Sequence, residues 1–411
     1  MKIVKLNPEQ FNKFVSHHKY RNYYQTSQYA NVIGRFGYKT QYIGITDDNN
    51  KLIGASLIIY KDVFMKNKIA YAPRGILFDY TNKNNVLELV KALRKSLGKQ
   101  GFMILRIDPY IPLTIRDSSG TIMNINQEGS KIIKNLQEAE FSYKGKNLYF
   151  ETEKPRWEAL ITLQKDVQEV FERLDKRNRN KIRRSINYGI VAIKDPSNNV
   201  NRIFNYIRDK EHFPIGYYEK IKKEFKDNLD IYLVKINPEK YLINSRKKYE
   251  KEIEYNNSLA ESIQNMEIDA KDREVYLNKK IQSDQIITSY KSNLLTATNL
   301  LKEYPNGIII GGALIIKYDN AAYILAEGYD NKYKNLNPGF LLKWQLINDY
   351  TEENLKYINL SAIAGNFEKD NKYSILNESK LGFNSIVTEY IGEFDVILNS
   401  FSYNLYQKMN K

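Results

Sequence analysis

The sequence predicts an α/β protein built from two similar domains, with a long helical arm inserted into the second. A strand–strand–helix–strand pattern occurs near the N-terminus and again near the C-terminus. The stretch between Pro238 and Pro305 contains no glycine and no proline, and its apolar residues recur at helical spacing. With 411 residues, 42% of them hydrophobic, the chain is long enough for two ordinary cores and the arm.

The first pattern lies within the first 110 residues. Its predicted elements are strands at 41–46, 52–60 and 69–72, a helix at 86–97 and a strand at 102–107. The strands are short apolar runs, and Asp47–Asn50 supplies a polar hairpin turn between the first two. Leucine and valine recur at helical spacing in the helix, and Gly98 or Gly101 ends it.

The second pattern repeats the first in the same order. Leu52–Ile59 matches Ile309–Ile316 almost position for position, which indicates an internal duplication. The other predicted elements of this copy are strands at 231–235, 321–324 and 357–360, and a helix at 340–350. The predicted domains are 1–150, with 395–411 packing back on it, then 151–237 with 304–394, and the arm at 238–303. The arm therefore interrupts a hairpin of the second domain, where insertions are tolerated.

The arm is predicted to be an antiparallel coiled coil. Apolar residues such as Tyr249, Ile253, Tyr290 and Leu294 form stripes with steps of three, four and seven. The polar run Asp269–Asp272 is the expected reversal, and two helices of roughly 30 residues would extend about 45 Å. The alternative is a simple spacer or dimerisation element, so the arm either folds back within one chain or pairs between chains.

Composition excludes several kinds of chemistry. The chain has no cysteine, which excludes disulfides, iron–sulfur clusters and thiol nucleophiles, and its three histidines make neither a metal site nor a Ser–His triad. The N-terminus lacks the apolar core of a signal peptide, and no run reaches the ~20 apolar residues of a membrane span. We therefore expect a soluble, cytoplasmic protein. The net charge of +15 suits RNA, an anionic membrane face or a phosphorylated substrate.

The most basic stretch of the chain is 173–185. It is predicted to be a helix with few acidic residues, so phosphate binding is its natural use and a solvated basic face is the alternative. The predicted RNA-binding residues are Lys176, Arg177, Arg179, Lys181, Arg183 and Arg184.

Two predicted strands end in charged residues. Arg74 and Asp108 follow the strands at 69–72 and 102–107, and ligands meet side chains at strand ends in α/β folds. Asp108 is a candidate general base, a ligand anchor or a turn residue. Neither domain has a glycine-rich phosphate loop, and Asn335–Gly339 is a weak substitute. An acyl donor other than coenzyme A fits this pattern.

Several motifs together resemble the Fem family, over nearly the whole chain. The matching stretches are Tyr24–Thr26, Pro73–Gly75 with Asp79–Tyr80, Ile107–Tyr110, Lys176–Arg183, Gly312–Leu314 and Ile391–Phe394. The resemblance implies two acetyltransferase-like domains with a helical arm in the second. It also implies an aminoacyltransferase that moves an amino acid from aminoacyl-tRNA to an amine on the stem peptide of a peptidoglycan precursor. The precursor is lipid-linked or UDP-linked, and no cofactor or metal takes part.

The resemblance also suggests roles for individual residues. Asp108 matches a carboxylate near the acceptor amine, and Lys380, in Ser379–Gly382, matches a lysine implicated in transfer and tRNA engagement. The alternative for Lys380 is a surface lysine before a strand. Tyr217 matches a residue of the precursor site, and we expect Arg74 and Arg35 to bind substrate as well.

The chain departs from FemX-like members around the acceptor. Ile33 and Phe213 stand where a lysine and an arginine would contact the diphosphate, and Met103 and Ala326 stand where tyrosines line the pocket. Either the precursor is held differently, as a lipid-linked form at the membrane face would be, or the acceptor is another molecule. The alternatives are transfer to a protein N-terminus and a non-catalytic member that binds tRNA or another Fem-type transferase.

Overall fold

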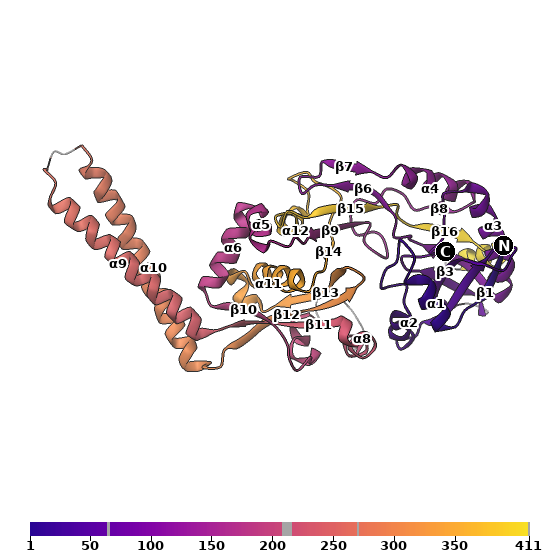
Figure 1. The fold of residues 1–411 in the computed structure, drawn as a ribbon, viewed down its shortest axis with the longest axis horizontal. Coiled ribbons are helices and arrows are strands. Elements are labelled where there is room, and N and C mark those ends of the chain that lie inside the picture. The colour runs from indigo at the N-terminus through magenta and orange to yellow at the C-terminus, as the bar shows by residue number, and fades with distance from the viewer. Residues whose placement is uncertain (64–65, 208–215, 269–270, 410–411) are drawn as a thin grey trace.

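The computed structural model describes residues 1–63, 66–207, 216–268 and 271–409. Two mixed β-sheets lie side by side, helices cover their faces, and a two-helix arm projects from the far end of the second sheet (Figure 1). The predicted α/β class with two sheets is therefore confirmed.

The first sheet has the strand order β1-β2-β3-β4-β5-β16-β8. Its strands are β1 (Lys2–Lys5), β2 (Lys39–Thr46), β3 (Leu52–Asp62), β4 (Lys68–Ala72), β5 (Phe102–Ile107), β16 (Phe394–Ile397) and β8 (Ser142–Tyr143). Helices α1 (Pro8–Val15) and α2 (Ser27–Gly34) pack on one face, and α3 (Lys83–Ser96) and α4 (Gln127–Glu138) pack on the other. Because both faces are covered, six successive residues in the middle of β3 are buried.

The second sheet has the order β10-β11-β12-β13-β14-β9-β15-β6-β7. Its strands are β10 (Ile190–Lys194), β11 (Leu229–Ile236), β12 (Ile308–Tyr318), β13 (Ala321–Tyr329), β14 (Tyr357–Ala362), β9 (Trp157–Thr162), β15 (Ile386–Tyr390), β6 (Pro112–Arg116) and β7 (Ile122–Ile125). The helices α5 (Val167–Arg173), α6 (Lys176–Asn187) and α11 (Pro338–Glu352) share one core with this sheet. On its other face, α7 (Phe204–Ile207) and α8 (Tyr217–Phe225) share a core with α1 and α2, so this core joins the two halves.

The two sheets contain the same sequence of elements. In the first, β2, β3 and β4 are antiparallel, and α3 leads to the parallel strand β5. In the second, β11, β12 and β13 are antiparallel, and α11 leads to the parallel strand β14. The two predicted patterns are confirmed, whereas the acetyltransferase likeness of each unit stays a prediction.

Sheet membership does not follow the predicted chain order everywhere. β6 and β7 lie within residues 1–150, yet β6 pairs with β15 in the second sheet. β16 follows β15 directly and pairs with β5 in the first sheet; it lies largely in the segment 395–411, which was expected to pack back on residues 1–150. Strand patterns in a sequence record burial and not the pairing partner, so the place of β6 and β7 leaves no sequence signal. The predicted domain boundaries stay a prediction.

Helices α9 (Pro238–Gln264) and α10 (Arg273–Glu303) form the arm and run antiparallel (Figure 1). Asn237 caps α9, and Pro238 occupies its first position, which is the usual start of a helix. The reversal lies between Gln264 and Arg273, in agreement with the predicted polar run, although residues 269 and 270 lie outside the described part.

The seam between the arm helices is more polar than the sequence predicts. Asn256 Nδ2 donates to Asp284 Oδ1 at 2.9 Å, and Ser283 Oγ donates to Glu252 Oε1 at 2.7 Å. Predicted stripe residues such as Ile253 are only half-buried. The structure therefore shows an antiparallel helix pair, and regular coiled-coil packing stays a prediction.

Two shorter helices complete the chain: α12 (Ser374–Leu381) and α13 (Ser400–Met409). None of the helices in the described ranges combines the length and apolar character needed to cross a bilayer.

Candidate functional site

The carboxyl ends of β4 and β5 bring two predicted site residues together. The strands are parallel, with Ala72 opposite Ile107, so Arg74 and Asp108 emerge side by side. The backbone N–H of Arg74 donates to Asp108 Oδ1 at 2.6 Å, and Arg74 NH1 lies 3.7 Å from Asp108 Oδ2. The two candidate residues therefore form one buried pair, and their roles in the reaction stay predictions.

The side chain of Arg74 connects the two sheets. It is only 2% exposed, and it donates to Glu158 Oε1 of β9 at 2.7 Å and to the Pro155 carbonyl at 2.8 Å. The guanidinium lies 5.1 Å and 4.9 Å from the ring centres of Tyr110 and Tyr390. These contacts hold Arg74 between the two sheets, and its role in binding substrate stays a prediction.

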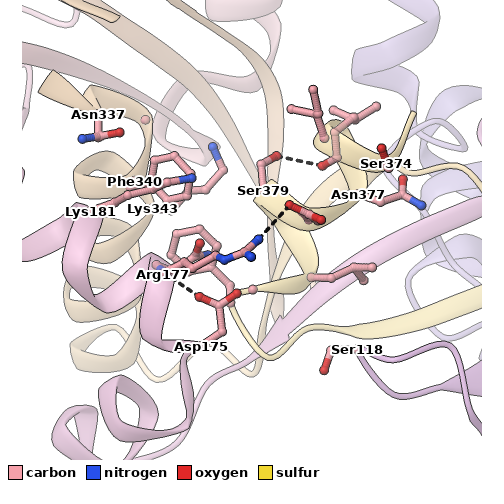
Figure 2. A pocket seen from close by; sticks show the side chains of 18 of the residues that line it. Ser118, Asp175, Arg177, Lys181, Asn337, Phe340, Lys343, Ser374, Asn377 and Ser379 are labelled. Carbon is pink, nitrogen blue, oxygen red and sulfur yellow. Dashed lines mark hydrogen bonds and ion pairs between the residues drawn. The ribbon is translucent and has the colours of Figure 1, made fainter. Parts of the chain in front are cut away.

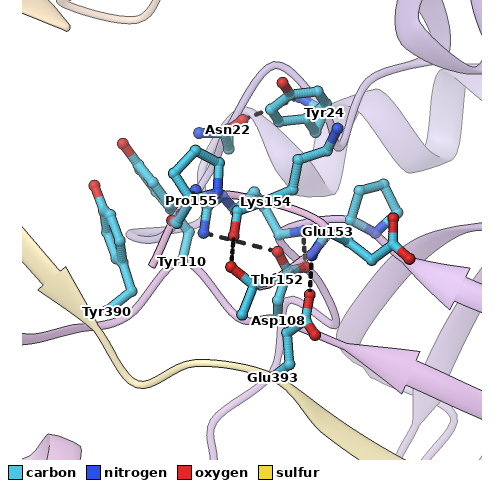
Figure 3. A network of polar contacts seen from close by, with 12 residues as sticks. Asn22, Tyr24, Asp108, Tyr110, Thr152, Glu153, Lys154, Pro155, Tyr390 and Glu393 are labelled. Atoms are coloured by element: carbon cyan, nitrogen blue, oxygen red, sulfur yellow. Dashed lines mark hydrogen bonds and ion pairs between the residues drawn. The ribbon is translucent and has the colours of Figure 1, made fainter. Parts of the chain in front are cut away.

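Asp108 lies in a network crossed by the segment from Thr152 to Pro155 (Figure 3). Burial raises the pKa of Asp108 from 3.8 to about 7, although the charge of Arg74 and its N–H hydrogen bond act in the opposite direction. Burial also raises the pKa of Glu393, which accepts a hydrogen bond from the backbone N–H of Glu153 at 2.5 Å. A carboxyl group that titrates near neutral pH can accept a proton and release it again.

Lys380 lies near the carboxyl ends of β13 and β14 in the second sheet. Its Nζ donates to the carbonyl of Ala362, the last residue of β14, at 2.7 Å. Glu327 on β13 is bound by Lys343 Nζ at 2.7 Å and by the Tyr329 hydroxyl at 2.9 Å. Burial favours a higher pKa for Glu327. The charges of Lys343 and Lys380, together with the hydrogen bonds from Lys343 and Tyr329, outweigh burial and lower the pKa below its ordinary value. Lys380 therefore lies within electrostatic reach of a half-buried carboxylate.

A short series of contacts links Lys380 to Asp108. Ala362, which accepts from Lys380, lies opposite Glu158 in the pairing of β14 with β9. Glu158 binds Arg74, and Arg74 binds Asp108. The link therefore runs from α12, through β14 and β9 of the second sheet, to the ends of β4 and β5 in the first.

A large pocket of about 1460 Å³ lies next to α12, the helix that carries Lys380 (Figure 2). Its walls are the start of α6, the loop from 334 to 340 with the start of α11, and the segment 366–383. Ser379 and Leu381 line it, on either side of Lys380 in sequence. The pocket occupies the position where ligands bind in α/β folds, beyond the carboxyl ends of the strands.

The basic helix α6 forms one wall of the large pocket. Asp175 caps this helix by accepting from the Asn178 N–H at 2.5 Å, and Lys176, Arg177, Lys181 and Arg184 line the pocket. Lys181 Nζ lies 4.2 Å from the ring centre of Phe340, and Arg177 pairs with Glu378 at 3.4 Å.

The other two predicted cations of α6 lie away from the large pocket. Arg179 donates to the carbonyl of Glu172, and the guanidinium of Arg183 lies 5.3 Å from the ring centre of Phe171. The sequence showed a basic helix but not which of its cations share a face.

The remaining predicted substrate residues lie where α2 meets α8. Tyr217 begins α8, is almost fully buried, and packs against Phe36 at a ring distance of 5.7 Å. Arg35 follows α2 and is exposed, whereas Ile33 belongs to the core that Tyr217 enters. An apolar residue at 33 therefore fits its surroundings.

The other departures from FemX-like members lie elsewhere. Met103 on β5 and Ala326 on β13 are both buried, and Phe213 lies outside the described residues.

Sequence reasoning missed Glu158. It accepts hydrogen bonds from Arg74, Asn359 and the hydroxyls of Tyr110 and Tyr390, so it organises both sides of the site. In the sequence, Glu158 could have been noticed as a charged residue inside the otherwise largely apolar stretch 157–162. Buried charges of this kind require partners, which makes them informative.

The comparisons with known proteins cover the whole chain. The sequence model of the FemAB family matches residues 6–411. Aminoacyltransferase FemA of Staphylococcus epidermidis is 25% identical over 423 residues, covering 100% of this chain and 99% of that protein. Lipid II:glycine glycyltransferase of the same species is 24% identical, with coverages of 100% and 96%. The crystal structure of FemX superposes with a TM-score of 0.72 at 19% identity, covering 98% and 99% of the two chains, which shows a shared fold.

Proposed function

The chain belongs to the FemAB family, and from this premise we propose that it transfers an amino acid from aminoacyl-tRNA to an amine of a peptidoglycan stem peptide. The relatives named aminoacyltransferase and lipid II:glycine glycyltransferase identify it as an acyltransferase enzyme. The observation that carries the proposal is the large pocket walled by the cations of α6, with Lys380 beside it and Asp108 linked to it across the two sheets.

The pocket suits the acylated end of a tRNA. Four cations of α6 supply positive charge for phosphate groups, and Phe340 supplies a ring next to Lys181. The pocket volume of about 1460 Å³ exceeds that of an ordinary small-molecule site, as an extended nucleotide end requires.

The reaction needs no covalent intermediate on the enzyme. The acceptor ammonium first gives a proton to Asp108, whose pKa of about 7 allows this near neutral pH. The amine nitrogen then attacks the ester carbonyl, forming the new C–N bond and a tetrahedral oxyanion. The C–O bond to the ribose breaks as the second nitrogen proton passes to the leaving oxygen. Lys380 supplies positive charge for the oxyanion or the leaving oxygen.

The lipid-linked precursor is the acceptor that the relatives support best. Ile33 lies in the core between α2 and α8, so it offers no charge to a diphosphate at that position. Contacts to the precursor would then come from other residues, such as Arg35 at the end of α2.

The test combines purified protein, a mixed pool of charged tRNAs and lipid-linked precursor in detergent, with mass spectrometry of the stem peptide. The proposal predicts a mass gain of one or more amino acids that RNase abolishes. A parallel reaction with UDP-linked precursor separates the two acceptor forms.

If neither precursor gains mass while the protein still binds charged tRNA, the peptidoglycan stem peptide is not the acceptor. A gain on an added protein substrate would then favour transfer to a protein N-terminus. No binding of charged tRNA would refute the donor.

A further inference from the structure

A carboxylate lies directly behind the wall of the large pocket, on the side of the second sheet. Tyr329 of β13 and Lys343 of α11 both line this pocket, and Figure 2 shows Lys343 among the lining side chains. Lys343 Nζ donates to both carboxylate oxygens of Glu327, at 2.8 Å and 2.7 Å, and the Tyr329 hydroxyl donates to Oε2 at 2.9 Å. Glu327 is therefore in direct contact with two side chains of the pocket.

Glu327 is ionised at neutral pH. Burial raises its pKa, but the charge of Lys343, the hydrogen bonds from Lys343 and Tyr329 and the charge of Lys380 together lower it below the ordinary value. The negative charge of Glu327 therefore lies close to Lys380, whose Nζ is held by the carbonyl of Ala362.

The ion pair with Lys343 accounts for only part of the surroundings of Glu327. The Lys343 side chain is 9% exposed, and a buried ammonium group needs an acidic partner. The Glu327 side chain is 26% exposed, so one side of it is accessible to a ligand. A carboxylate has about four lone-pair sites, and the hydrogen bonds from Lys343 and Tyr329 leave capacity for a further donor.

The acids that line the large pocket directly have other contacts or are exposed. Among the lining residues that the structure describes, the acids are Asp175, Glu368 and Glu378. Asp175 caps α6, Glu378 pairs with Arg177 and is 65% exposed, and Glu368 is exposed as well. Glu327 is therefore the half-buried acid beside Lys380 that a cationic ligand in this pocket would meet.

The donor in the proposed function carries such a cation. In an aminoacyl ester, the α-carbon holds the ammonium group and is bonded directly to the carbonyl carbon that the acceptor amine attacks. A residue that binds the ammonium group must lie beside the residue that faces the ester oxygens, and Glu327 has this relation to Lys380. We propose that Glu327 binds the α-ammonium group of the aminoacyl-tRNA, with its carboxylate held in place by Lys343 and Tyr329. This inference rests on aminoacyl-tRNA as the donor in the proposed function.

The assignment gives Glu327 a part in selecting the donor. A hydrogen bond between an ammonium group and a carboxylate is stronger than one between neutral groups. An N-acylated aminoacyl-tRNA has no charge at this nitrogen, so it would leave the carboxylate without its cation. The pocket therefore favours donors whose amino group is free.

The test compares glycyl-tRNA with N-acetylglycyl-tRNA, because glycine adds no side chain that could mask the effect. Fluorescence anisotropy measures the Kd of the full-length protein for both probes and for deacylated tRNA. Wild-type protein should bind glycyl-tRNA about tenfold more tightly than the acetylated form, as expected for one charge-assisted contact. Glu327→Gln should abolish this preference without weakening the binding of deacylated tRNA. Glu352→Gln removes the same charge at an exposed position of α11 outside the pocket, and it should keep the wild-type preference.

A second variant guards against loss of folding. Glu327→Gln leaves the buried ammonium group of Lys343 without its acid, which is destabilising. The double variant Glu327→Gln, Lys343→Met removes both charges together, so no unpaired buried charge remains. It should also bind the two probes with equal affinity.

The other outcomes overturn the inference in distinguishable ways. If wild-type protein uses charged tRNA but binds both probes equally, Glu327 is not an ammonium site and the proposed function stands. If wild-type protein prefers glycyl-tRNA and the Glu327 variants keep that preference, another residue binds the ammonium group. If wild-type protein binds no charged tRNA, the donor and the ammonium site fail together.

Discussion

Replacing Asp108 with asparagine tests the buried carboxyl group through stability as well as activity. Burial raises the pKa of Asp108 to about 7 from the ordinary 3.8. Between pH 3.8 and about pH 7, Asp108 is protonated in the folded protein but ionised in the unfolded chain. Wild-type stability from this group is therefore full below about pH 4 and is lost as pH rises through about 7.

The size of the effect follows from the two pKa values. Each pH unit between them corresponds to about 1.4 kcal/mol, so ionising Asp108 in the folded protein costs about 4 kcal/mol. The substituted asparagine would not ionise, and it keeps a side-chain oxygen for the Arg74 N–H. The free energy of unfolding of Asp108→Asn, minus that of wild type, should therefore increase by about 4 kcal/mol from pH 4 to pH 8.

Urea unfolding at several pH values between 4 and 8 measures this difference, because the other ionisable groups contribute equally to both proteins. Asp79→Asn is a control, because a side-chain hydrogen bond from Thr81 lowers the pKa of Asp79 below its ordinary 3.8. That carboxyl group is ionised in both the folded and the unfolded state above about pH 4, so the stability difference for Asp79→Asn should stay nearly constant from pH 4 to pH 8. A difference for Asp108→Asn that stays constant from pH 4 to pH 8 would refute the raised pKa.

The same variant separates a proton acceptor from a structural residue. Wild-type transfer should increase with pH and level off above about 7, as Asp108 ionises. Asp108→Asn should lose this dependence and transfer about 10²–10⁴ times more slowly. A slow variant that keeps the wild-type pH profile would show that another group accepts the proton.

Three further predictions follow from the site. Lys380→Met should reduce transfer by at least about tenfold while the Kd for charged tRNA changes less, because its Nζ lies at the strand ends next to the pocket; equal losses in both would make it a binding residue only. Glu158→Gln should lower the free energy of unfolding by about 3–5 kcal/mol in urea, because Arg74 loses a buried partner; Glu151→Gln, at an exposed position, is the control. Lys181→Ala should weaken tRNA binding several-fold more than Arg179→Ala, because only Lys181 lines the pocket; equal effects would contradict that assignment.

Much of the fold could be predicted because the patterns that indicate strands and helices depend only on residues close together in the sequence. The strands at 52–60 and 102–107 and the helix at 340–350 lie within β3, β5 and α11, since runs of apolar residues and helical spacing are visible along the chain. The sheet that β6 and β7 join was not visible in this way. A short strand carries no record of which of two sheets it joins.

The sequence analysis placed Arg74 and Asp108 at the ends of two predicted strands but did not show that these residues meet. They meet because β4 and β5 are parallel, which follows from the helix between them. Glu158 comes from β9, which enters the second sheet between β14 and β15, and only the tertiary structure brings it to Arg74. The helical spacing of the arm likewise predicted two helices but not the polar pairs in their seam.

The duplicated unit gives the two sheets different electrostatic roles at equivalent places. At the ends of β4 and β5, the buried carboxyl group of Asp108 lies against Arg74, which also pairs with Glu158. Because burial raises its pKa to about 7, Asp108 can hold a proton near neutral pH. At the ends of β13 and β14, Lys380 lies beside a pocket with cationic walls. In the proposed reaction, the first end would take the amine that must lose a proton, and the second would take the phosphate-bearing donor that develops negative charge. Because Glu158 and Ala362 are paired on neighbouring strands, the two ends are held in register by the second sheet itself. If the proposed function holds, the pairing of β14 with β9 gives a physical reason for both copies of the unit to remain in a single chain.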